Sequence, residues 1–171
     1  MELYEETLMD YVRKNVPSDK RVLEFAKQLL EGLRILHEKN VAHLDIKPQN
    51  IFVKKIIDEN RLGEEEIFLK IADFNISLDL DKNQGPRYPV QGTVGFMAPE
   101  LETAYDELKA SNDSSKKTII YDPKKADMFS LGLTLCQCLR GKGNGEGYSW
   151  KKNQSELSEF MNKYKKSNLG E

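Results

Sequence analysis

Apolar residues recur at steps of three and four in the first forty positions, the period of an α-helix with one buried face. The clearest stripe lies in a segment that starts at Pro17-Ser18 and ends near Asn40. Its apolar positions are Val22, Phe25, Leu29, Leu33 and Leu36. A shorter helix is predicted from Thr7 to Lys14, with Thr7 as N-cap and Asp10 three positions on. Both helices should pack on one core.

Two short β-type runs follow, Ile51–Val53 and Ile67–Ile71. The connection between them, Lys54 to Glu66, is charged and polar. This pattern predicts a β-hairpin with an enlarged, solvent-exposed loop. The expected fold class is therefore mainly α with a small β-hairpin.

Further along, the pattern changes twice. Gly85-Pro86, Pro89 and Gly92 interrupt the segment from Ser77 to Met97, so we expect a mobile stretch without regular structure. By contrast, Met128 to Leu139 is apolar nearly all round, which predicts a fully buried helix.

The last part of the chain is expected to be separate from the main domain. Glycines alternate from Gly141 to Gly147, which is typical of a flexible linker. An amphipathic helix is predicted from Ser155 to Lys166. We therefore divide the chain into a domain at 1–141 and a linker with a terminal helix at 142–171.

Composition narrows the class of protein. The 171 residues have the length of one domain, and 26 basic against 28 acidic residues give a net charge of −2, so nucleic acid is not an expected partner. No apolar run is long enough to span a membrane, and the acidic N-terminus lacks a secretory pattern, so we expect an intracellular, cytoplasmic protein.

Cys136 and Cys138 lie two apart on a predicted helix, so their side chains point away from each other. This spacing favours buried thiols over a metal site.

Candidate chemistry gathers in two short segments. The first is His43-Leu44-Asp45-Ile46-Lys47-Pro48-Gln49-Asn50, and the second is Asp73-Phe74-Asn75. Together they place a catalytic base, a phosphate-contacting cation and two oxygen ligands for magnesium at the spacing of a phosphoryl-transfer site.

With two downstream blocks, Gly92–Glu100 (GTVGFMAPE) and Ala126–Gly132 (ADMFSLG), these segments resemble the eukaryotic protein kinase family. The position of Lys47, two residues after Asp45, resembles the pattern of the serine/threonine branch of the family. The resemblance implies a truncated kinase carboxy-terminal lobe at 1–141, containing the hinge, helices D and E, the catalytic loop, the activation segment and helix F.

The resemblance also implies roles for the site residues. Asp45 would orient the substrate hydroxyl and accept its proton, and Lys47 would offset charge on the phosphoryl oxygens of ATP. Asn50 and Asp73 would bind magnesium and, through it, ATP. His43 would be structural rather than catalytic.

Further positions follow from the same resemblance. Main-chain groups of Glu2 and Tyr4 would bind the adenine of ATP, with Phe52 beneath the ring. Thr93 would hydrogen-bond near the catalytic aspartate, and Asp127 would accept backbone N–H groups from the catalytic loop. His37 shows no partner pattern.

Three departures from the family pattern limit which properties of the family can be expected of this chain. Leu44 replaces a common arginine, which makes regulation by a segment phosphate less expected. Asn75 replaces a glycine and would tolerate positive φ at modest strain. The chain is expected to open at the hinge, without the amino-terminal lobe, so that ATP would lie on an open surface and activity would be low.

The leading function is thus a serine/threonine protein kinase domain that uses ATP and Mg²⁺ to phosphorylate a protein hydroxyl. The alternative is a non-catalytic, pseudokinase-like module that binds a partner protein over the open cleft. A truncated product or an incomplete gene prediction is a third possibility.

Overall fold

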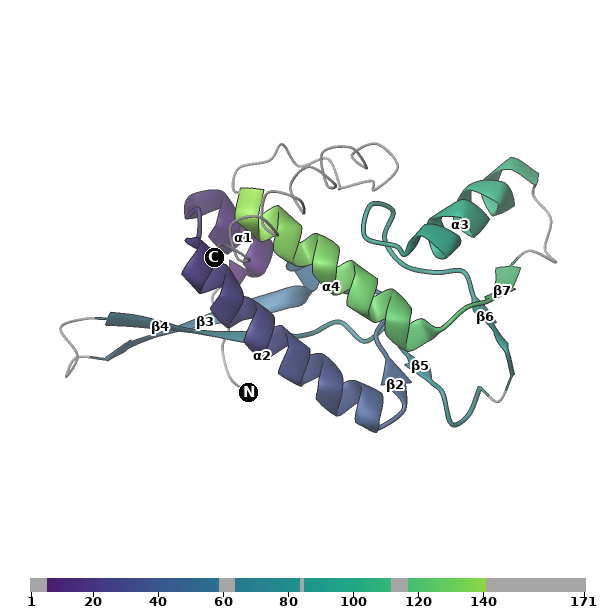
Figure 1. Ribbon diagram of the computed structural model, residues 1–171, viewed down its shortest axis with the longest axis horizontal. Helices are drawn as coiled ribbons and strands as arrows, with labels where there is room; N and C mark the ends of the chain where they lie inside the picture. Colours follow the sequence, from purple (N-terminus) through teal and green to yellow (C-terminus); the bar gives the residue numbers. More distant parts are fainter. Residues whose placement is uncertain (1–5, 59–63, 84, 112–116, 141–171) are drawn as a thin grey trace, which may run out of the picture.

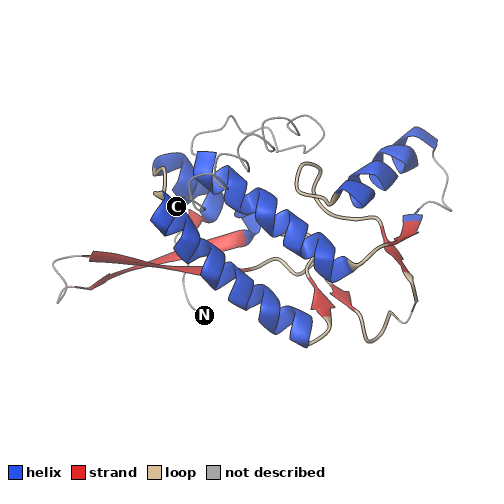
Figure 2. Cartoon of the chain, in the orientation of Figure 1, coloured by secondary structure: helices blue, strands red, loops and turns tan. Residues whose placement is uncertain are grey.

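The computed structural model describes residues 6–58, 64–83, 85–111 and 117–140 (Figures 1 and 2). Its elements are β1 (Glu6–Thr7), α1 (Leu8–Lys14), α2 (Asp19–Glu38), β2 (Val41–Ala42), a 3₁₀ turn (Pro48–Asn50), β3 (Ile51–Asp58), β4 (Glu64–Ile71), β5 (Leu78–Asp79), β6 (Arg87–Pro89), α3 (Pro99–Ser111), β7 (Thr118–Ile120) and α4 (Pro123–Arg140). For these residues the expected class, mainly α with a small β-hairpin, is confirmed in its helices and its hairpin, whereas the two further small sheets were not predicted. Glu2, Tyr4 and the predicted linker and terminal helix at 142–171 lie outside them.

The first two helices are confirmed, and so is the predicted Thr7 cap, whereas the Ser18 cap was not predicted. The Thr7 hydroxyl accepts from the Asp10 N–H (3.2 Å) and donates to the Asp10 carboxylate (2.7 Å). Ser18 caps α2 by accepting from the Arg21 N–H at 3.3 Å. These caps satisfy backbone donors that a helix leaves unpaired at its start. Four residues of the predicted α2 stripe are buried, namely Val22, Phe25, Leu29 and Leu33.

The hairpin is longer than the sequence predicted. β3 and β4 pair from Ile51–Ile71 out to Asp58–Glu64, so the expected loop from Lys54 to Glu66 is largely strand. Charged residues are accommodated because they pair with one another: the Lys55 ammonium lies 2.9 Å from Glu6 and 3.6 Å from Glu65. β1 adds a third strand beside β3. Figure 2 shows the hairpin extending away from the helices.

Helix α2 covers the outer edge of this sheet through a side-chain amide. Gln28 donates to the Ile67 carbonyl and accepts from the Leu69 N–H, both at 2.8 Å. It therefore satisfies two backbone groups that an edge strand would leave open to another chain. Gln28 also fixes α2 against β4, with which it is in contact.

Helix α4 lies along α2 at the centre of the molecule (Figure 1). Leu131 and Cys138 of α4 join Phe25, Leu29 and Leu33 of α2 in the main core. The prediction of a fully buried helix is wrong on one face, because the side chain of Met128 is 44% exposed. No helix of the described residues is both long and apolar enough to cross a membrane.

The two cysteines on α4 differ in burial. Cys138 is buried and Cys136 is only partly so, which confirms the expectation of a buried thiol for Cys138 alone. Burial raises the pKa of the Cys138 thiol to about 12 and raises that of Cys136. Both thiols are therefore protonated at neutral pH.

The segment from Ser77 to Met97 contains two short strands that the sequence analysis did not predict. β5 pairs with β2, and β6 pairs with β7. Both partners lie outside the segment, so its own glycines and prolines gave no sign of the pairing. A second apolar cluster beneath it joins Leu44, Met97 and Leu101 to Ala126 of α4.

Candidate active site

The start of the loop that contains Asp45 is bound to α4 through one carboxylate. Asp127 is fully buried and accepts from the backbone N–H groups of His43 (2.8 Å) and Leu44 (2.7 Å), as the sequence predicted. Leu44 has a φ of 63°, a left-handed backbone that a leucine adopts only under constraint. Asp127 supplies that constraint, because rotating either peptide would leave a buried donor without its acceptor.

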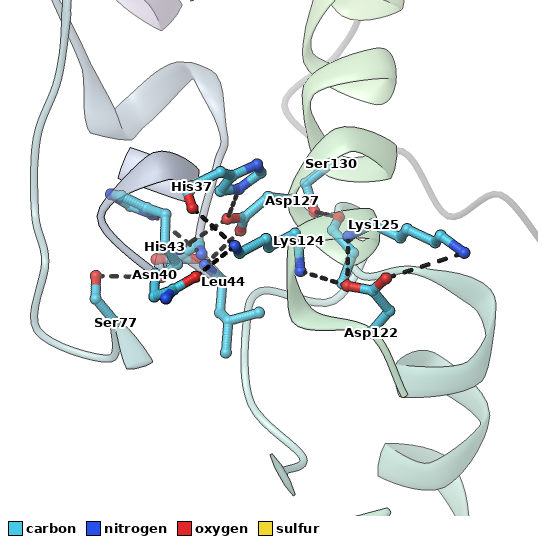
Figure 3. Close-up of polar contacts among 12 residues, drawn as sticks. His37, Asn40, His43, Leu44, Ser77, Asp122, Lys124, Lys125, Asp127 and Ser130 are labelled. Atoms are coloured by element: carbon cyan, nitrogen blue, oxygen red, sulfur yellow. Dashed lines mark hydrogen bonds and ion pairs between the residues drawn. The ribbon is translucent and has the colours of Figure 1, made fainter. Parts of the chain in front are cut away.

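His37 is a partner of Asp127 that the sequence analysis missed. Its Nε2 lies 2.9 Å from the Asp127 carboxylate (Figure 3). A carboxylate only accepts, so His37 donates the N–H here. The two residues are 90 positions apart, and no local spacing signals such a contact.

His43 connects the catalytic loop with the segment around Asp73. Its Nε2 is 3.0 Å from the Ala72 carbonyl, and its Nδ1 accepts from the Asp45 N–H at 3.2 Å. These partners assign the proton to Nε2 and leave Nδ1 as the acceptor. Its ring also lies edge-on to Phe74, with centroids 4.9 Å apart. Both nitrogens and the ring are engaged by the fold, consistent with a structural role.

Asp45 accepts hydrogen bonds from three side chains. Lys47 Nζ (2.7 Å) and Asn50 Nδ2 (2.8 Å) contact Oδ2, and the Thr93 hydroxyl (2.6 Å) contacts Oδ1. Burial acts to raise the pKa of this carboxyl, but the hydrogen bonds from Lys47 and Thr93 outweigh it, and the pKa lies below its ordinary value. Asp45 is therefore an anion at neutral pH.

Thr93 closes a triangle with Asp45 and Lys47, because its hydroxyl also accepts from Lys47 Nζ at 2.7 Å. The neighbouring Gly92 makes this approach possible. It has a φ of +130°, and a Cβ there would lie 2.9 Å from the Leu44 carbonyl oxygen. The segment that contains Thr93 thus contacts the loop that contains Asp45 at a point where only glycine fits.

Asn50 and Asp73 come from adjacent backbone. Asn50 donates through Nδ2 to the Asp45 carbonyl (2.9 Å), and its own carbonyl accepts from the Ala72 N–H (2.9 Å). Asp73 follows directly, with a φ of 64° and an exposed side chain. Within the segment Asp73-Phe74-Asn75, the positive φ falls on Asp73 and not on Asn75, where the sequence analysis had allowed for it.

The donor set at this point suits a hard cation. The Asn50 Oδ1 and the Asp73 carboxylate are oxygens to which no hydrogen bond is made by another described residue. No cluster of three or more His, Cys, Asp or Glu side chains suited to a metal occurs in the described part of the chain. Magnesium usually takes one or two protein ligands and completes its shell with phosphate and water, so the chemistry of these two oxygen donors suits it.

The predicted residues therefore divide into three groups. Lys47 and Asn50 each contact Asp45 directly. Asp73 is joined to Asn50 through the backbone of its neighbour Ala72. Phe52 lies on β3 beyond Asn50, with 39% of its surface exposed. The adenine-binding residues predicted at 2 and 4 lie outside the described residues.

Comparison with known proteins identifies the class. The chain matches the protein kinase domain over residues 1–169 and belongs to the protein kinase family. The interferon-induced, double-stranded RNA-activated protein kinase of Rattus norvegicus is 32% identical over 136 residues, which cover 78% of this chain and 22% of that protein.

Other relatives carry different specificities in their names. The membrane-associated tyrosine- and threonine-specific cdc2-inhibitory kinase of Drosophila melanogaster is 30% identical over 80% of this chain and 21% of its own length. Serine/threonine-protein kinase ULK3 of Xenopus laevis is 29% identical over 92% of this chain and 28% of its own length. The chain thus spans about a fifth to just over a quarter of these relatives.

Proposed function

We propose that this chain contains the catalytic half of a serine/threonine protein kinase, which transfers the γ-phosphoryl group of ATP to a protein hydroxyl. The observation that carries the proposal is the triangle of Asp45, Lys47 and Thr93, with side-chain distances of 2.6–2.7 Å. It unites the catalytic loop with the activation segment. Solvated loop residues without a shared role would not converge in this way.

Asp45 orients the substrate hydroxyl and accepts its proton. An ionised carboxylate has about four acceptor positions, and the three protein donors leave about one for the substrate. Since the pKa of Asp45 is lowered, the group acts mainly by alignment and takes the proton late, when the hydroxyl has become acidic. Lys47 keeps a positive charge beside Asp45, where it offsets charge on the transferred phosphoryl oxygens.

Asn50 and Asp73 are the residues that would hold magnesium, and Phe52 is the described residue that would contact the adenine of ATP. Magnesium neutralises charge on the ATP phosphates when it is bound. The protein's part is to present two oxygens from backbone that one hydrogen bond, Ala72 N–H to Asn50 carbonyl at 2.9 Å, keeps together.

Serine or threonine is the proposed acceptor. Lys47 stands where the serine/threonine branch of the family has it, and the name of one relative states this specificity. The test is mass spectrometry of a peptide mixture that offers serine, threonine and tyrosine, after incubation of the chain with Mg²⁺ and ATP. Phosphoserine and phosphothreonine are expected, at a slow rate because the exposed Phe52 leaves the site open to water. Phosphotyrosine alone would refute the assignment.

Regulation by a phosphate on the activation segment is not expected. Leu44 is 5% exposed and packs in the apolar cluster beneath the segment, so it offers no cation for a phosphate. Treating the protein with an activating kinase, with the modified residue mapped by mass spectrometry, should change the transfer rate little. A large gain that follows segment phosphorylation would contradict this.

A non-catalytic binding module is the second candidate, favoured by exposed apolar side chains on the hairpin. Phe52, Ile56 and Phe68 are 39%, 42% and 40% exposed. A partner protein could cover this surface. Thermal unfolding with ATP, with and without Mg²⁺, separates the two candidates. The kinase requires a stabilisation that depends on both, and the binding module shows none.

A further inference from the structure

The side chain of Lys124, in the first turn of α4, reaches the end of α2. Its ammonium donates to the His37 carbonyl (2.7 Å) and to Asn40 Oδ1 (2.8 Å). In Figure 3 it points toward these residues, whereas the adjacent Lys125 points toward Asp122 on the other side. The two lysines are thus neighbours in sequence with different surroundings.

The position suits a cation for two reasons. The His37 carbonyl is one of the last in α2, where no further helical turn supplies a donor, and it accepts from the Asn40 N–H (3.1 Å) as well as from Lys124. The C-terminal end of a helix also carries partial negative charge, which favours a lysine. Lys124 therefore stabilises the end of α2 from a different element.

Asn40 extends this contact to the activation segment. Its backbone is left-handed, with a φ of 51°, and its carbonyl accepts from the Leu80 N–H at 2.8 Å. Its Nδ2 donates to Asp81 Oδ1 at 2.9 Å while its Oδ1 receives Lys124. One side chain thus joins α2, α4 and the stretch that follows β5.

Lys124 and Asp127 are three residues apart on α4, so they lie on one face of the helix. Lys124 binds Asn40, and Asp127 binds the backbone of His43 and Leu44. A single helical turn therefore fixes the chain at two points immediately before Asp45.

We propose that Lys124 is a positioning residue for phosphoryl transfer, which sets the entry of the catalytic loop through Asn40. This rests on the proposed function for the role of Asp45, but the positioning itself can be measured without activity.

The test is hydrogen exchange, followed by mass spectrometry, in the 171-residue chain. Lys124→Met keeps the aliphatic stem and removes the ammonium. Amides at 40–45 should exchange at least about tenfold faster, since tenfold is the change expected for the loss of one charge-assisted hydrogen bond and this variant loses two. Lys125→Met is the matched control and should leave them unchanged, because its side chain is 84% exposed. Lys124→Arg should restore most of the protection.

A second variant acts at the other end of the contact. Asn40→Gly keeps the left-handed backbone at no steric cost and removes both side-chain contacts. It should raise exchange at 40–45, and Lys124→Met should add less to it than it adds to the wild type, because the two variants share the loss of the Lys124–Asn40 contact while only Lys124→Met also loses the His37 carbonyl contact. Unchanged exchange in either single variant, or full additivity in the double variant, overturns the proposal. Faster exchange spread evenly over the chain also overturns it, since it would show general destabilisation.

Kinetics complete the test. If Lys124 positions Asp45, Lys124→Met should lower kcat with little change in the KM for ATP, and Lys124→Arg should recover kcat. A rise in KM alone would overturn the positioning role. If the wild-type chain transfers no phosphate, the proposed function fails, while the exchange results still decide whether Lys124 fixes the loop.

Discussion

The catalytic loop and the Asp73 segment present their carboxylates in opposite ways. Asp45 receives hydrogen bonds from Lys47, Asn50 and Thr93, all within 2.8 Å. Asp73 is exposed on left-handed backbone, and no described side chain hydrogen-bonds its carboxylate. The first carboxylate is oriented by the protein, whereas no described side chain hydrogen-bonds the second. This difference is consistent with the proposed roles of Asp45 as base and of Asp73 as metal ligand.

Replacing Asp45 should have the largest effect. Asp45→Asn keeps the shape but removes the charge and the acceptor for the hydroxyl proton, so phosphoryl transfer should fall about 10²–10⁴-fold. ATP affinity should change little. Steady-state kinetics with Asp19→Asn, an exposed carboxylate at the start of α2, as control would measure this. Transfer at the wild-type rate would remove Asp45 from the mechanism.

Asp127→Ala should be the most destabilising change near the loop. It leaves the buried N–H groups of His43 and Leu44 without an acceptor, at a cost of about 1–3 kcal/mol each. Urea unfolding should show the loss, and Asp19→Ala should show almost none. An Asp127 variant as stable as the wild type would mean that the loop is fixed in some other way.

Gly92→Ala tests the contact between the activation segment and the catalytic loop. The added Cβ would lie 2.9 Å from the Leu44 carbonyl on backbone with a φ of +130°. A cost of about 1–3 kcal/mol is expected, together with slower transfer as Thr93 moves from Asp45. Gly85→Ala, with no atom within 4 Å of its Cβ, is the matched control. Equal unfolding free energies for the two variants would contradict the close approach.

Asp73→Asn should have the smallest effect on stability and a specific effect on metal binding. Its carboxylate is exposed, so the unfolding free energy should change by no more than about 0.5 kcal/mol. The concentration of Mg²⁺ needed for ATP binding should rise about tenfold or more, since a charged ligand is lost. Titration calorimetry with ATP at several Mg²⁺ concentrations measures how the affinity for ATP depends on Mg²⁺. An unchanged Mg²⁺ requirement would exclude Asp73 as a ligand.

The sequence predicted the parts of the fold and site that depend on local pattern. The stripe through Phe25 and Leu29 and the cap at Thr7 follow from spacing, and the closeness of Asp45, Lys47 and Asn50 follows from their place within six residues, although their direct contacts were not predicted.

The contacts that the sequence did not predict join residues that lie far apart along the chain. The hairpin extends because Lys55 finds Glu6 and Glu65, and the segment after Asp73 forms strands only because β2 and β7 pair with it. The Lys124–Asn40 contact spans 84 positions, so no spacing rule points to it.

The most direct test is a crystal structure of the chain with Mn²⁺ and a non-hydrolysable ATP analogue, with the metal located by its anomalous scattering. The account predicts a metal bonded to Asn50 Oδ1 and the Asp73 carboxylate, with Asp45 still held by Lys47 and Thr93 and not a ligand. A metal bound elsewhere, or one coordinated by Asp45 in place of Asp73, would contradict it.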